Sequence, residues 1–191
     1  MLLLFLLHNA LNVKWYGSLF KGKYGPVRVV HTIVNIGVLL AILCLGFSGI
    51  VLSRYVFSFV QSGPLATARI LHLAASYWGF VLMSVHAGLH WQMVLGAARR
   101  LKKEKPASQP APWILCLAAI GIAVYGLFCF VRADILSYMF LKNQFVFFDF
   151  EKSAASVLAE YAAMMGFWIF GGYYISKAVK KDKRQEMEVI R

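Results

Sequence analysis

The stretch ILHLAASYWGFVLMSVHAGLHWQMVL, residues 70–95, contains no Lys, Arg, Asp or Glu, yet it contains three histidines. A membrane-spanning helix needs about 20 predominantly apolar residues, so an uncharged run of this length predicts a transmembrane helix. Ionisable side chains inside such a helix are costly and usually mark a functional site. This one segment therefore predicts both the fold class and where the chemistry is located.

Three other apolar runs, at 29–52, 113–131 and 154–175, are also long enough to span a bilayer. Residues 1–13 are apolar as well, but a helix of that length reaches only about 20 Å, short of a hydrocarbon core of ~30 Å. A signal peptide is disfavoured, because no basic segment precedes MLLLFLL and no small-residue cleavage site follows it. The sequence predicts an all-α integral membrane bundle, a single domain over 1–191, with four full transmembrane helices and a truncated N-terminal one.

Composition and charge agree with this reading. The chain is 60% hydrophobic, against about 45–50% apolar residues in soluble domains. The net charge of +12 comes from Lys and Arg that flank the apolar runs, so we read it as a signal for orientation and exclude nucleic acid as a partner. Fifteen of the 20 basic residues lie within 14–28, 99–105 and 177–191. The positive-inside rule then predicts a cytoplasmic C-terminus.

The segment at 132–152 is too aromatic for an ordinary solvated loop, because it contains the run FVFFDF at 145–150. An interfacial segment at the membrane surface is one reading; a quinone pocket or a partner-docking surface is the other. Glu160 is the acidic residue that enters a helix, where it could relay protons to a quinone, pair with Arg132, or simply pack.

No motif supports catalysis by the chain alone. The sequence has no nucleophile–base arrangement, P-loop or Rossmann fingerprint. Cys44, Cys116 and Cys129 form neither CxxC nor CxxCH, which argues against a zinc site, a dithiol redox motif and covalently attached haem. A non-catalytic subunit is therefore expected.

The three histidines of 70–95 share one face of their helix. At 3.6 residues per turn, His72, His86 and His90 fall on a single stripe, and His72 lies about 21 Å along the axis from His86. Ser76 and Gly79 lie on the same stripe. A glycine there leaves room either for a flat macrocycle or for a close neighbouring helix.

Depth in the membrane divides the histidines into two groups. His8 ends the first apolar run and His31 begins the second, so both lie on the cytoplasmic side with His86 and His90, while His72 alone lies on the outer side. A neutral imidazole is a good iron ligand, and two from different helices can hold a b-type haem in a bundle core. A non-haem metal or proton pathway, and plain packing, are the alternatives.

The candidate sites follow from this grouping. An inner haem pairs His86 with a histidine of the first two helices, preferably His8, and a second, outer haem uses His72. The candidate metal ligands are His8, His31, His72, His86 and His90, and the candidate cofactor contacts are Arg28, Ser76 and Gly79. The partner of His72 is expected in a part of the first helix that precedes Met1.

The stretches WYGSLFKGKYG (15–25), GFSGIVLSRYVF (46–57) and ARILHLAASYWGFVLMSVHAGLHW (68–91) resemble a bacterial cytochrome-b-like membrane domain family of unknown function. That family is akin to the haem-bearing membrane subunits of formate dehydrogenases, and its genes often lie beside those of FMN-binding extracellular redox proteins. The resemblance implies a multi-pass protein of the bacterial cell membrane that transfers electrons through haem b. Members carry another histidine early in the first helix.

Two functional hypotheses follow. The first is electron transfer through one haem b or two, from a quinone or a cytoplasmic donor to an extracytoplasmic, flavin-carrying or iron–sulfur partner. The second is a haem-free membrane scaffold or transporter module for a flavinylated partner. Membrane lipid is a neighbour in both.

Overall fold

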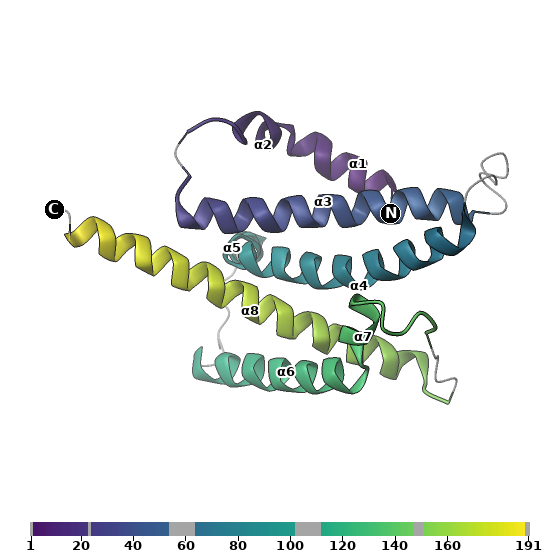
Figure 1. Ribbon diagram of the computed structural model, residues 1–191. Helices are drawn as coiled ribbons and strands as arrows, with labels where there is room; N and C mark the ends of the chain where they lie inside the picture. The colour runs from purple at the N-terminus through teal and green to yellow at the C-terminus, as the bar shows by residue number, and fades with distance from the viewer. Residues whose placement is uncertain (1, 23, 54–63, 102–111, 147–150, 190–191) are drawn as a thin grey trace.

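A computed structural model describes residues 2–22, 24–53, 64–101, 112–146 and 151–189 (Figure 1). Every regular element in these ranges is a helix. The helices are α1 (Leu2–Leu11), α2 (Val13–Ser18), α3 (Pro26–Leu52), α4 (Leu65–Leu89), α5 (Trp91–Leu101), α6 (Pro112–Arg132), α7 (Ile135–Met139) and α8 (Ala154–Val189).

Four of these helices are long and apolar enough to cross a membrane, over Pro26–Leu52, Leu65–Leu89, Trp113–Arg132 and Ala154–Lys180. This confirms the predicted all-α membrane bundle with four full-length helices, and it marks a multi-pass membrane protein. A single segment can cross a bilayer only as a helix, because its backbone N–H and C=O groups then form hydrogen bonds with one another. The helices lie side by side in the order α3, α4, α8, α6 (Figure 1), with α3 against α4 and α8 against both α4 and α6.

Several helix bounds differ from the apolar runs for local reasons. α3 begins at Pro26, since proline is favoured at the first helical position, where its missing N–H is not needed. α4 ends at Leu89 and α5 begins at Trp91, with a break at His90. α5 carries Arg100 near its end. Because of the break, this charged residue does not lie along a continuation of the α4 axis. α8 continues well beyond residue 175 as a basic extension.

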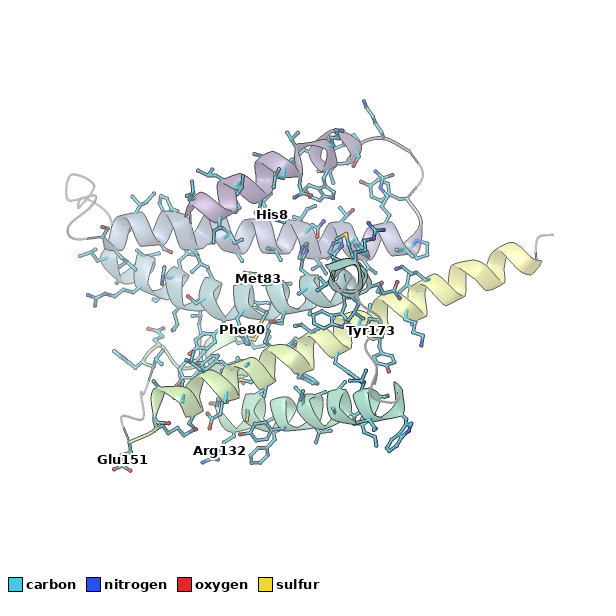
Figure 2. The ribbon with its side chains drawn as sticks, turned by 180° about the vertical axis from the view of Figure 1, so that it is seen from behind. His8, Phe80, Met83, Arg132, Glu151 and Tyr173 are labelled. Carbon is cyan, nitrogen blue, oxygen red and sulfur yellow. The ribbon has the colours of Figure 1, made fainter. Side chains whose placement is uncertain are left out.

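The N-terminal segment forms the short helix α1 of 10 residues, followed by α2. At 1.5 Å per residue α1 is about 15 Å long, half of a hydrocarbon core. In both views it begins beside the second half of α3 and runs toward the beginning of α3 (Figures 1 and 2). Its position carries His8 to the end of the bundle where α3 begins and α4 ends.

Small residues bring α8 close to its neighbours. A methyl group added at Gly126 of α6 would lie 2.0 Å from the carbonyl oxygen of Ala163, and one at Gly88 of α4 would lie 2.3 Å from that of Ile169. Neither distance is tolerable between real atoms. These two glycines therefore set how closely α6 and α4 approach α8.

The short helix α7 follows α6 and packs against the middle of α4. Ile135 and Met139 are almost fully buried. The indole nitrogen of Trp78 donates to the carbonyl oxygen of Met139 at 3.0 Å, and the rings of Tyr77 and Tyr138 stack at 5.1 Å. This part of the aromatic segment packs inward onto α4. Residues 147–150 of the FVFFDF run lie outside the described residues.

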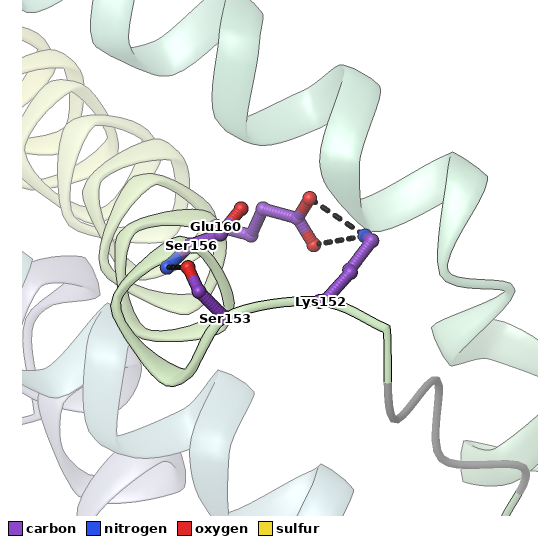
Figure 3. Close-up of polar contacts among 4 residues, drawn as sticks. All are labelled: Lys152, Ser153, Ser156 and Glu160. Carbon is purple, nitrogen blue, oxygen red and sulfur yellow. Dashed lines mark hydrogen bonds and ion pairs between the residues drawn. The ribbon is translucent and has the colours of Figure 1, made fainter.

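Glu160 near the start of α8 forms an ion pair with Lys152, whose ammonium nitrogen lies 2.7 and 2.9 Å from the two carboxylate oxygens (Figure 3). Both side chains are partly exposed. Cys129, Arg132 and Ala133 line a small cavity of about 190 Å³ beside this pair. From the sequence, Arg132 was a candidate partner of Glu160. In the structure Glu160 is paired with Lys152.

Candidate functional site

Four of the five histidines gather at one end of the bundle, although they come from different elements. The ring centroids of His86 and His90 are 4.8 Å apart, those of His8 and His86 are 6.4 Å apart, and those of His31 and His90 are 5.0 Å apart. We call this the basic end, because Arg28 and Lys180 lie there as well. The structure thus brings together the histidines that the sequence grouped by depth.

His86 is held by a neighbouring helix. Its Nδ1 nitrogen lies 2.9 Å from the side-chain oxygen of Asn35 on α3. An amide oxygen only accepts hydrogen bonds, so Nδ1 carries the proton and Nε2 keeps its lone pair. Metal-binding histidines commonly have this arrangement, in which the second ring nitrogen donates to a fixed oxygen and sets the orientation of the ring.

His8 faces His86 from α1, at a centroid separation of 6.4 Å and an interplanar angle of 75°. Imidazole binds metals at about 2 Å from its nitrogen, so a metal held between two imidazoles places the ring centroids roughly 6 Å apart. The separation of His8 and His86 fits that arrangement. His8 itself is exposed and His86 is half-buried, so the pair lies at the side of the bundle.

His31 and His90 form a second, edge-to-face pair at an angle of 84°. The Nε2 atom of His31 is buried and has no hydrogen-bond partner. Buried polar atoms are rarely left unpaired, so this nitrogen is a candidate to bind a ligand or another partner. Burial, and after it the positive charge of Lys180, lowers the pKa of His90. The neutral imidazole, which is the metal-binding form, is thereby favoured.

A cavity of about 580 Å³ opens beside these histidines. Its volume lies within the range of roughly 300–1,000 Å³ that is usual for small-molecule and cofactor sites. The wall combines apolar, polar and cationic side chains from the loop and helices at the basic end: Trp15, Ser18, Leu19, Gly25, Val27, Arg28, His31, Thr32, Asn35, His90 and Lys180.

His72 lies at the opposite end of α4, about four helical turns from His86. Its Nδ1 nitrogen is 3.0 Å from the hydroxyl oxygen of Ser48 on α3. The single proton of that hydroxyl is donated to the carbonyl oxygen of Cys44 at 2.6 Å. With that proton on the Cys44 carbonyl, Ser48 accepts from Nδ1 of His72, and the Nε2 lone pair is available.

The three residues predicted to contact a cofactor lie in different surroundings in the structure. The hydroxyl of Ser76 donates to the backbone oxygen of His72 at 2.7 Å. Gly79 faces α3, where an added methyl group would lie 3.6 Å from the Cβ atom of Ala41, so a neighbouring helix occupies its open side. Arg28 lines the cavity, with its guanidinium 4.1 Å over the ring of Tyr24.

Sequence reasoning missed Asn35, Ser48 and Lys180. An amide such as Asn35 inside an apolar run is itself a signal, because polar groups within a membrane-spanning segment require partners. Ser48 gives a weaker signal, since serine commonly bonds to its own helix. Lys180 gave no signal of a site, because its charge contributed only to the predicted orientation of the chain in the membrane.

The residues fit a haem better than a bare metal ion. Within the described part of the chain, no three His, Cys, Asp or Glu side chains come close enough to hold an ion between them. A haem iron takes its equatorial ligands from the porphyrin and needs only axial ligands from the protein. Two facing imidazoles, one of them with its tautomer fixed, meet that smaller requirement.

Comparisons with known proteins give no further information about the site. A scan of family models, a search of curated proteins and a search of solved structures each found no match to this chain.

Proposed function

We propose that this chain is a membrane cytochrome b that transfers electrons across the bacterial cell membrane. The observation that carries the proposal is the pair His8 and His86, 6.4 Å apart, with Nδ1 of His86 donating to Asn35. His8 and His86 would hold a haem b at the basic end, which the distribution of Lys and Arg assigns to the cytoplasm. His72 would ligate a second haem at the outer end.

When bound, haem b supplies a one-electron Fe(III)/Fe(II) couple. The chain's own contribution is to orient imidazoles and to exclude water between the two ends. Asn35 and Ser48 keep the Nε2 lone pairs of His86 and His72 free, and the two residues lie on the same helix, α3. His72 and His86 lie about 21 Å apart along α4, so haems at the two positions would let electrons cross a ~30 Å core in shorter steps.

The chain would act as a non-catalytic subunit. A quinone or a cytoplasmic protein would donate electrons at the basic end, and a flavin-carrying or iron–sulfur protein would accept them outside. This assignment of partners rests on the resemblance of residues 15–25, 46–57 and 68–91 to the cytochrome-b-like family.

The visible spectrum of the purified protein tests the proposal. The full chain, produced in haem-sufficient bacteria and solubilised in mild detergent, should show a b-type α-band after reduction with dithionite. His86→Ala should lose most of that band. Ser84→Ala is the matched control, because Ser84 is buried on the same helix and bonds only to its own backbone. A wild-type protein without the band would favour the haem-free scaffold or transporter.

A further inference from the structure

The cavity at the basic end has a positively charged wall. Arg28 from α3 and Lys180 from α8 both line it, and none of the described residues that line it is acidic. Gly25 and Val27, at the positive N-terminal end of α3, add to the same potential. A cavity with this lining and with walls partly of low polarity favours an anionic ligand over a neutral or cationic one.

The cavity also adjoins the proposed haem ligands. Asn35 contributes to its wall and accepts the hydrogen bond of His86, while His90 contributes to its wall and lies 4.8 Å from the ring of His86. Only one side chain thus separates the cavity from an imidazole that would bind iron. A group extending from a macrocycle at His86 needs only that short distance to reach Arg28 and Lys180.

We infer that this cavity binds the two carboxylate groups of haem b, with Arg28 and Lys180 as their cationic partners. The inference rests on the proposed function and adds the direction of the cofactor: its carboxylate edge points toward the basic end. Carboxylates at the boundary of a membrane are costly unless they are paired. Two cations beside the cavity match two carboxylates, and one of them comes from α8, a helix that carries no histidine.

Lys180 is the better residue for a test, because its hydrogen bond is a long one, 3.4 Å from its ammonium nitrogen to the side-chain oxygen of Gln92. Arg28, by contrast, donates to the backbone oxygen of Ser18 and so also holds the loop before α3. Lys177, about one turn earlier on α8, lies 5.9 Å over the ring of Tyr174 and is outside the cavity lining. It serves as the control.

The experiment compares two probes, haem b and its dimethyl ester, in which both carboxylates are blocked. Each is titrated into the detergent-solubilised full chain prepared from haem-limited cells. Lys180→Met should weaken the binding of haem b about fivefold, the upper range for an ion pair at an exposed rim, and should leave the binding of the ester unchanged. Lys180→Arg should restore binding, and Lys177→Met should change neither probe.

Other outcomes overturn the inference. Equal weakening of both probes by Lys180→Met would make Lys180 a structural residue, and no weakening of either would exclude it from the site. If haem b and the ester bound equally while Lys180→Met lost a co-purifying anionic phospholipid, the cavity would be a lipid headgroup site. A wild-type chain that binds neither probe would instead refute the proposed function, so the two failures are distinct.

Discussion

The Nδ1 nitrogen of His72 lies 3.0 Å from the hydroxyl oxygen of Ser48, which donates its own proton to the carbonyl oxygen of Cys44. With that proton on Cys44 the histidine donates, so Ser48 on the neighbouring helix favours the Nδ1–H tautomer of His72. Ser48→Ala should lower the population of the Nδ1–H tautomer of His72. Nitrogen NMR of protein labelled at histidine measures this population directly. Ser84→Ala, which removes a hydroxyl bonded within α4, should leave the spectrum of His72 unchanged, and an equal change in both variants would contradict the assignment.

Asn35 should tune the site at the basic end. Asn35→Ala removes the acceptor for Nδ1 of His86, and loss of such a partner typically weakens metal binding about 10- to 100-fold. Asn35→Asp replaces the amide with a stronger, charged acceptor, makes the imidazole more electron-rich and should lower the reduction potential of the haem proposed there. Haem titration and redox potentiometry give the two readouts. Unchanged affinity and potential in both variants would remove Asn35 from the site.

The contact between α6 and α8 should tolerate no side chain at Gly126. A methyl group there meets the carbonyl oxygen of Ala163 at 2.0 Å, so Gly126→Ala should destabilise the fold by about 1–3 kcal/mol through overpacking. Gly121 lies on the same helix with no atom within 4 Å of an added Cβ. Gly121→Ala should therefore leave stability unchanged or raise it by up to ~1 kcal/mol. Thermal unfolding in detergent distinguishes them, and equal melting temperatures would contradict this close approach of α6 to α8.

The ion pair between Lys152 and Glu160 should be structural. Both side chains are partly exposed, so Glu160→Gln should cost about 1 kcal/mol or less and leave haem content unchanged. A double-mutant cycle with Lys152→Met measures the coupling between the two residues. A loss of electron transfer in Glu160→Gln at unchanged stability would instead favour the proton-relay role.

The C-terminus should be cytoplasmic. Fifteen of the 20 Lys and Arg residues lie in the segments that topology places on the same side as Arg191. A fluorescent protein fused after Arg191 should fluoresce, and alkaline phosphatase fused at the same position should be inactive. An active phosphatase fusion would reverse the orientation and with it the assignment of the basic end.

The sequence alone determined the spanning helices and the histidine stripe. Both are local properties: a run such as 29–52 is apolar enough to span whatever lies beside it, and the stripe of His72 and His86 follows from the helical repeat. Even the grouping of His8 with His86 by depth needed only the direction of each helix. The break at His90 was not foreseen, because the apolar run continues through it without a Gly or Pro at that position.

Only the tertiary structure decided which side chains meet across helices. Asn35 with His86 and Ser48 with His72 join residues that lie 51 and 24 positions apart, and Lys180 reaches the cavity from the last helix. Such contacts depend on how each helix is rotated about its axis. That rotation is fixed by packing at close approaches such as Gly88 and Gly126, and no pattern within a single helix determines it.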